Sequence, residues 1–79
     1  MENREITNEL KVWRARRNAT QEELANAIDV SRQTINAIER GRFVPSVLTA
    51  LKIAAFFDAQ VEEIFFLRTE SAHEKTGQL

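Results

Sequence analysis

One short stretch, residues 30–42 (VSRQTINAIERGR), concentrates side chains that recognise planar polar partners. Arginine presents a rigid fork of donors, and the amides of glutamine and asparagine present a donor beside an acceptor. Both groups can make paired hydrogen bonds to a partner that has two adjacent polar atoms. Apolar residues alternate with them at helical spacing, so one face of a helix would be buried and the other would be polar. The polar face is therefore a candidate binding surface, formed by Arg32, Gln33, Asn36 and Arg40.

Capping and stop signals define the helix that carries this face. Ser31 is a typical N-cap, and Gly41 suits the left-handed conformation that often ends a helix. Upstream, the sequence TQEE at residues 20–23 has the spacing of a capping box, which predicts the start of another helix. Only Asp29 and Val30 separate the two helices, and Val30 is expected to pack beneath the turn. Two capped helices joined by so sharp a turn predict a helix-turn-helix.

Three further helices complete the expected fold. The five helices are expected over about residues 6–17, from the Thr20 cap to near Asp29, over residues 32–40, from the Ser46 cap to about Phe57, and within residues 58–67. Two glycines and one proline offer little turn chemistry for strands, so the sequence predicts an all-α, five-helix domain. Its expected core residues are Ile6, Leu10, Trp13, Leu24, Ala25, Ile28, Ile35, Ile38, Val47, Ala50, Leu51, Ala54, Phe57, Val61, Ile64 and Phe65.

Charge is distributed unevenly along the 79 residues, whose net charge is −1. Residues 11–42 hold seven basic and four acidic residues, a net charge of +3, whereas the remainder holds four basic and eight acidic residues, a net charge of −4. A local basic surface favours phosphate binding even when the whole chain is slightly acidic. The charge pattern is thus compatible with a nucleic-acid partner.

A protruding polar helix of this kind fits double-stranded DNA. The major groove admits one α-helix and displays a distinct donor and acceptor pattern for each base pair. Arg32 can bond guanine O6 and N7, Gln33 or Asn36 can bond adenine N6 and N7, and Ala37 can approach a thymine methyl group. Groups suited to phosphate are the free amides where helices begin, at Gln21, Arg32 and Val47, and the guanidinium groups of Arg40 and Arg42.

Three segments in one register, TQEELA, VSRQTINAIERGR and PS…LKIA, resemble the helix-turn-helix of the lambda-repressor and Cro-like (XRE) transcriptional regulators. The resemblance covers about residues 6–67 and implies a five-helix domain that binds operator DNA as a two-fold dimer. It also implies a structural ion pair between Arg14 and Glu39. We therefore expect base contacts from Arg32, Gln33, Asn36 and Ala37, and phosphate contacts from Gln21, Thr34, Arg40, Arg42, Phe43 and Ser46.

Four positions depart from the pattern of that family. Asp29 stands where glycine is usual, and Asp58 where glycine or asparagine is usual; aspartate tolerates left-handed backbone better than most residues. Gln60 replaces the usual Ser or Thr cap of the last helix, and Ala19 is smaller than the usual residue before the Thr20 cap. These changes concern stability and the angle of the turn rather than the polar face.

The run Phe65, Phe66 and Leu67 is too apolar for one short helix to bury entirely. We interpret it as a possible interface of a homodimer, the alternative being that the chain folds back to cover it.

No apolar run approaches the roughly 20 residues of a membrane-spanning helix, and the N-terminus lacks a signal peptide. We expect no membrane partner, and a cytoplasmic protein associated with the nucleoid.

An enzyme is not expected. The only histidine, His73, lies in the polar residues 68–79, and there is no cysteine, so we expect no catalytic site, metal, cofactor or small-molecule ligand.

Residues 1–67 are expected to be the DNA-binding domain, and residues 68–79 a flexible tail. The sequence thus predicts a transcriptional regulator, most specifically a repressor that binds a palindromic operator as a homodimer. Two alternatives stay open: an antitoxin that regulates its own operon, and a protein-interaction module that has lost DNA binding.

Overall fold

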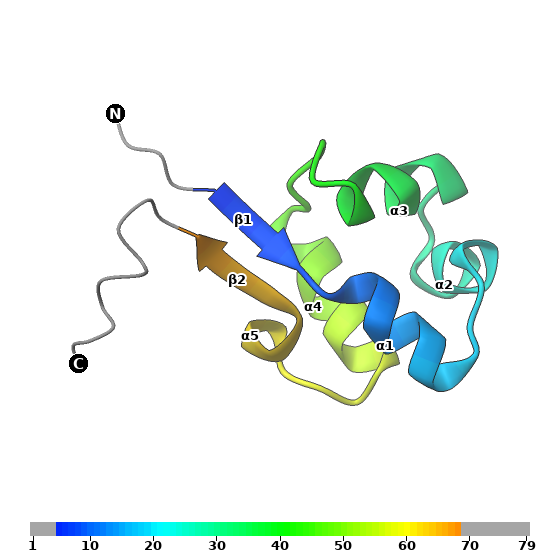
Figure 1. The fold of residues 1–79 in the computed structure, drawn as a ribbon. Helices are drawn as coiled ribbons and strands as arrows, with labels where there is room; N and C mark the ends of the chain where they lie inside the picture. Colours follow the sequence, from blue (N-terminus) through cyan, green and yellow to red (C-terminus); the bar gives the residue numbers. More distant parts are fainter. Residues whose placement is uncertain (1–4, 69–79) are drawn as a thin grey trace.

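The computed structural model describes residues 5–68, which fold into five short helices and two short strands (Figure 1). In chain order, the elements are β1 (Glu5–Asn8), α1 (Leu10–Arg17), α2 (Gln21–Ile28), α3 (Arg32–Glu39), α4 (Val47–Phe56), α5 (Val61–Ile64) and β2 (Phe65–Arg68). Viewed as in Figure 1, the strands form a ribbon at one end of the molecule and α2 lies at the other.

Side-chain caps begin the three central helices where the sequence predicts them. The Thr20 hydroxyl accepts a hydrogen bond from the Glu23 N–H at 2.9 Å, and the Glu23 carboxylate accepts one from the Thr20 N–H at 2.8 Å. Ser31 and Ser46 likewise accept from backbone N–H groups three residues on. These bonds satisfy donors that a helix leaves without an internal partner. The predicted starts of α2, α3 and α4 are therefore confirmed.

The two strands contradict the prediction of an all-α fold. β1 and β2 pair in antiparallel fashion, with Ile6 opposite Leu67 and Asn8 opposite Phe65. Since Ile6 belongs to β1, the first helix begins at Leu10 rather than near Ile6. The Asn8 side chain accepts a hydrogen bond from the Leu10 N–H at 3.0 Å, at the first residue of the helix. The fifth helix ends at Ile64, and the apolar run that follows it is a strand.

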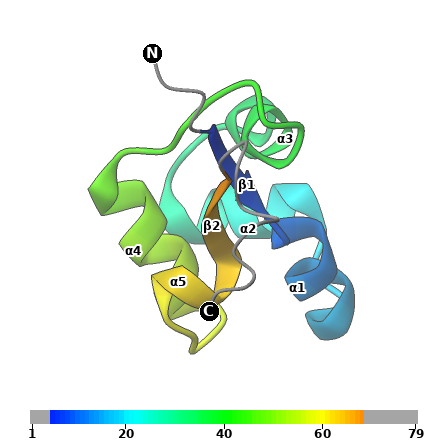
Figure 2. The same ribbon diagram turned by 60° about the vertical axis from the view of Figure 1, so that its left-hand side comes forward.

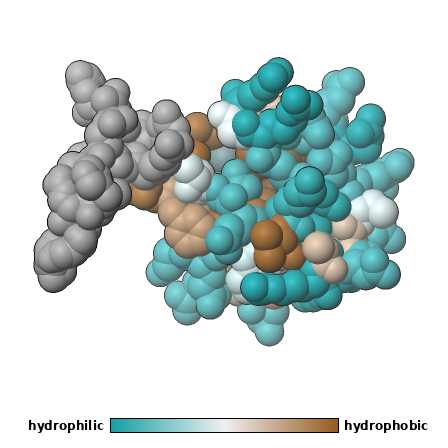
Figure 3. Space-filling view, in the orientation of Figure 1, coloured by the Kyte–Doolittle hydropathy of each residue, from teal (hydrophilic) through white to brown (hydrophobic). Residues whose placement is uncertain are grey.

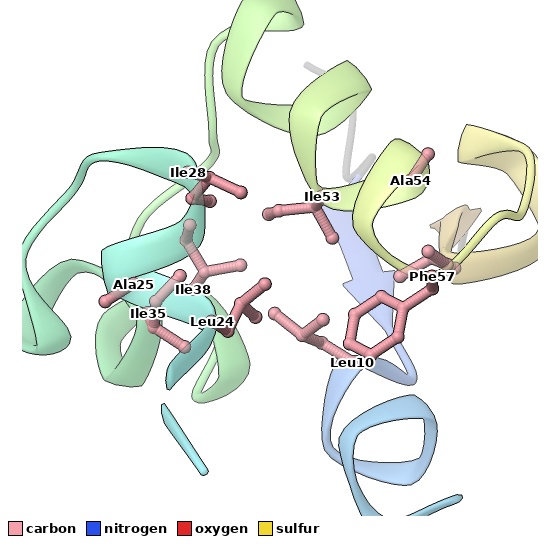
Figure 4. Packing of buried hydrophobic residues seen from close by; sticks show 10 residues of the cluster. Leu10, Leu24, Ala25, Ile28, Ile35, Ile38, Ile53, Ala54 and Phe57 are labelled. Atoms are coloured by element: carbon pink, nitrogen blue, oxygen red, sulfur yellow. The ribbon is translucent and has the colours of Figure 1, made fainter. Parts of the chain in front are cut away.

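The core lies between the helices. Figure 4 shows the buried side chains pointing toward one another from α1, α2, α3 and the α4 region. Trp13, Val30, Val61 and Phe65 are partly buried and pack against this cluster. The buried cluster consists of Leu10, Leu24, Ala25, Ile28, Ile35, Ile38, Ile53, Ala54, Phe57 and Ile64.

Three predicted core residues are instead exposed. Ile6 is 38% exposed, because it belongs to the ribbon and not to α1. Val47 and Leu51 are 76% and 54% exposed. α4 is apolar on nearly all sides, so its sequence does not reveal which face turns inward; in the structure that face carries Ala50, Ile53 and Ala54. The other face of α4 is solvent-exposed in the single chain.

Candidate nucleic-acid interface

A sharp turn between α2 and α3 sets the position of the polar helix. Asp29 adopts the left-handed conformation, with φ of 64°, and the Val30 N–H donates to the Ala25 carbonyl at 3.0 Å. The Ser31 hydroxyl then accepts from the Thr34 N–H at 3.0 Å, which starts the next helix. Aspartate holds this conformation at some energetic cost, since glycine alone adopts it freely. The result is a helix-turn-helix made of α2 and α3.

One side of α3 is anchored in the core and the opposite side is available to a partner. Ile35 and Ile38 are fully buried, at 0% and 1% exposure. Arg32 and Gln33 are exposed in the first turn, and Asn36 and Ala37, one turn on, are half-buried. Figure 3 shows a largely hydrophilic surface over α2 and α3. The candidate base-reading residues therefore share one face of a helix that lies at the surface (Figures 1 and 2).

Thr34 takes part in the cap of α3. Its N–H bonds to the Ser31 hydroxyl, and its own hydroxyl lies 2.9 Å from that oxygen. Ser46 plays the same part at the start of α4, where its hydroxyl accepts from the Thr49 N–H and donates to the Thr49 hydroxyl, both at 3.1 Å. These two candidate phosphate contacts thus flank helix N-termini, where free amides favour an anion.

The start of α2 is joined to the end of α3 through Glu39. Arg14 donates from Nε to Glu39 Oε2 at 2.5 Å and from Nη2 to Oε1 at 3.1 Å. Gln21 donates from Nε2 to Glu39 Oε1 at 3.0 Å. Arg14 also donates from Nη1 to the Ala19 carbonyl at 2.9 Å. One carboxylate, whose side chain is 6% exposed, therefore holds α1, the first residue of α2 and the recognition helix together.

Gln21 and Arg32 line the same shallow depression. Its volume is about 580 Å³, and Arg14, Asn18 and Thr20 also contribute to its wall. The depression lies where the end of α1, the start of α2 and the start of α3 meet, so it brings a helix N-terminus next to two guanidinium groups. Arg14 is already bonded to Glu39 and to the Ala19 carbonyl, so the exposed Arg32 and the amides at the start of α2 are the donors that suit a phosphate oxygen here.

The loop after α3 carries the remaining candidate phosphate contacts. Gly41 takes the left-handed conformation, with φ of 74°, and the Arg42 N–H donates to the Ala37 carbonyl at 2.9 Å. This geometry ends α3 and turns the chain toward α4. Arg40, Arg42 and Phe43 are exposed along this path. Arg42 therefore extends the polar face, which ends at Arg40, as a basic surface into the loop.

One residue near the interface has a role that the sequence did not reveal. Asn8, at the end of β1, donates from Nδ2 to the Ile38 carbonyl at 2.9 Å while its Oδ1 caps α1. The ribbon is thereby bonded to the last turn of the recognition helix. Asparagine often bonds a backbone N–H two residues on, as Asn8 does with Leu10, but its bond to α3 depends on packing between segments 30 positions apart.

The predicted interface residues at the other end of the chain are divided. Phe65 is half-buried and packs against the core, whereas Phe66 and Leu67 are 38% and 68% exposed.

Within residues 5–68, there is no group of three or more His, Asp or Glu side chains that could hold a metal ion. His73 and the predicted tail beyond residue 68 lie outside the described residues. No helix of the described part has the length and apolar character to cross a membrane.

Known proteins are similar to this chain in sequence, and others are similar to it in fold. A relative from Methanocaldococcus jannaschii, named an uncharacterized HTH-type transcriptional regulator (MJ0272), is 55% identical over 60 residues, which are 76% of this chain and 91% of that protein. A second, YgzD from Bacillus subtilis, also named an uncharacterized HTH-type transcriptional regulator, is 45% identical over 66 residues, 84% of this chain and 100% of that protein.

Solved structures give the same result. The restriction-modification controller protein C.AhdI from Aeromonas hydrophila superposes with a TM-score of 0.65 at 30% identity, covering 68% of this chain and 82% of that one. The transcriptional regulator VanUg gives 0.73 at 18% identity, over 89% and 93% of the two chains, a likeness of fold alone. The family model described as "Helix-turn-helix" matches residues 10–64. The chain therefore belongs to the XRE-type helix-turn-helix family and is a DNA-binding transcriptional regulator.

Proposed function

We propose that this regulator is a repressor that binds a palindromic operator as a homodimer. The observation that carries the proposal is the division of α3 into a buried face, with Ile35 and Ile38 in the core, and a polar face at the surface. The core contacts fix the rotation of the helix about its axis. The same side chains therefore always point outward, as sequence reading requires.

Four residues on the outward side of α3 read bases in this proposal. Arg32 bonds O6 and N7 of a guanine, and Gln33 and Asn36 bond N6 and N7 of adenines. Ala37 packs against a thymine methyl group, because a longer side chain there would hold the helix away from the groove. Arg32 and Gln33 are exposed, whereas Asn36 and Ala37 are half-buried, so Arg32 and Gln33 are the first to reach the base edges.

A second group of residues fixes the position of α3 on the DNA backbone. Such contacts carry no sequence information, but they supply much of the affinity and its dependence on salt. Gln21 is well placed for this, because its bond to Glu39 fixes the amide beside the free N–H groups of α2. The proposed phosphate contacts are Gln21, Thr34, Arg40, Arg42, Phe43 and Ser46, and Phe43 makes its contact through its backbone N–H, because its side chain is apolar.

A homodimer follows from the small number of bases that one helix can read. A single α3 presents about four side chains to the groove, whereas two copies related by a two-fold axis read two half-sites about 34 Å apart. Their contact energies then add. Repression is the direct consequence of occupancy, because a dimer seated on a promoter excludes polymerase from the same DNA.

Selection from random duplex DNA at near-physiological salt tests this function. We expect enrichment of a palindrome whose half-sites lie about one helical turn apart, and protein added to a promoter that contains it should lower transcription in a purified system. A variant in which Arg32 and Gln33 are both alanine serves as the control and should enrich no common site. Failure of the wild-type protein to enrich any sequence would refute the proposal.

A further inference from the structure

α4 has an apolar face that the rest of the described chain leaves uncovered. Its inward face carries Ile53 and Ala54 in the core, whereas its outward face carries Val47, Leu48 and Leu51, which are 76%, 62% and 54% exposed. Leu51 lies one turn from both of the others, so the three side chains form a continuous stripe. A helix that is apolar on both faces is typical of one that is buried on both.

The preceding loop extends this stripe. Phe43 and Val44 are 51% and 57% exposed just before α4 begins. We call the five residues Phe43, Val44, Val47, Leu48 and Leu51 the α4 apolar surface. Together they expose an area on the order of 500 Å², which is as large as the largest apolar patches of typical monomers, and such patches are often functional. Residues 40–57 contain no carboxylate, and Lys52 is the one charged residue of α4 itself.

We propose that the α4 apolar surface is the interface at which a second copy of this chain docks. The inference rests on the homodimer proposed above and specifies which surface forms it. One partner of a standard interface buries about 800 Å², so these five side chains supply more than half of that area. A two-fold axis brings the same surface of both copies together, and an apolar surface without acidic groups is complementary to itself.

The place of α4 in the chain agrees with the DNA-bound arrangement. The loop of residues 40–46 leads directly from α3 to α4. None of the five residues of the α4 apolar surface belongs to α3, so a two-fold axis beside α4 leaves the polar face of each copy available for its own half-site.

The ribbon is the competing surface. Leu67 is 68% exposed, but its neighbours Ile6 and Phe66 are each only 38% exposed, and both strands are four residues long. Phe65 already packs against the core. The ribbon therefore offers a smaller apolar area than α4, and it is the natural comparison for any experiment that disrupts the interface.

Matched glutamine variants distinguish the two surfaces. The double variant Leu48→Gln/Leu51→Gln alters the α4 apolar surface, Leu67→Gln alters the ribbon, and Val12→Gln alters an apolar residue of α1 that is 43% exposed. Glutamine is neutral and a good helix former, so it neither repels DNA nor unfolds a helix. Circular dichroism checks the fold, and sedimentation velocity measures the mass of each protein alone and on the selected palindromic duplex.

We expect the wild type, Leu67→Gln and Val12→Gln to occupy both half-sites cooperatively as dimers. The α4 double variant should fill half-sites independently, with a dimer dissociation constant raised at least tenfold. A folded α4 variant that retains wild-type dimerisation overturns the inference while leaving the proposed homodimer intact, and loss of dimers in Leu67→Gln alone would assign the interface to the ribbon. A wild type that fills half-sites as independent monomers would instead overturn the homodimer itself.

Discussion

Arg14 and Glu39, 25 positions apart, form a two-bond ion pair that joins the first helix to the end of the recognition helix. The Glu39 side chain is 6% exposed and that of Arg14 is 15% exposed, so both charges are largely withdrawn from water. Gln21 adds a third bond to the same carboxylate. The pair therefore links the stability of the fold to the geometry of the surface that faces DNA.

Removing one partner of the Arg14–Glu39 pair should lower the free energy of unfolding substantially. Arg14→Ala leaves the Glu39 carboxylate buried without its cation, and the expected loss is about 3 kcal/mol of unfolding free energy. Urea denaturation followed by circular dichroism measures this loss. Arg16→Ala is the control, because Arg16 is exposed and stacks on the Trp13 ring, with its guanidinium carbon 5.2 Å from the ring centroid. Equal, small losses in both variants would contradict the structural role given to the pair.

Asn8 should stabilise the fold through its two side-chain bonds. Asn8→Ala removes the cap of α1 and the bond to the Ile38 carbonyl, with an expected cost of about 2 kcal/mol. Asn8→Asp retains an acceptor for the Leu10 N–H but loses the donor to Ile38. We expect the aspartate variant to recover only part of the loss in thermal or urea unfolding. Full recovery would show that the bond to α3 contributes nothing.

The two left-handed positions beside α3 should respond in opposite directions. Gly41→Ala should destabilise by about 1 kcal/mol, because φ is 74° and an alanine there is strained. Its Cβ meets nothing within 4 Å, so the effect is conformational rather than steric. Asp29→Gly should stabilise by a few tenths of a kcal/mol up to about 1, because φ there is 64°. Thermal unfolding of both variants checks the signs, and a stabilised Gly41→Ala would refute the argument.

The local parts of this fold could be predicted from the sequence, and its long-range contacts could not. The caps at Thr20, Ser31 and Ser46 and the buried pair Ile35 and Ile38 follow from spacing within a few residues. The ribbon escaped prediction because Ile6 pairs with Leu67 at the other end of the domain. Neither strand has a nearby turn signal, and each short apolar run also fits a helix.

In the candidate site, too, the local features could be predicted from the sequence and the long-range contacts could not. The helical period predicts that Arg32 and Gln33 share the exposed face of α3. The bond from Gln21 to Glu39 and the bond from Asn8 to the Ile38 carbonyl depend on how α1, α2 and the ribbon pack on α3. On α4, composition alone could not select the inward face, since Val47 and Leu51 are as apolar as the residues that are buried.

Arg42 should act on all DNA sequences alike. Arg42→Ala removes one proposed phosphate contact, so affinity should fall equally for the selected operator and for unrelated duplex. The plot of log affinity against log salt should become shallower by about one unit. Lys11→Ala, which removes an exposed cation on α1, should leave that slope unchanged. A loss confined to the selected operator would move Arg42 into the group of base-reading residues.

The central claim, that the polar face of α3 reads base sequence, is tested most directly with Gln33→Ala. Its affinity should be measured by fluorescence anisotropy for the selected operator and for operators changed at each base pair in turn. We predict a loss of about 1 to 3 kcal/mol on the selected operator, with discrimination abolished at one symmetric pair of positions and retained at the others. An equal loss on every duplex, with discrimination unchanged at all positions, would contradict the account.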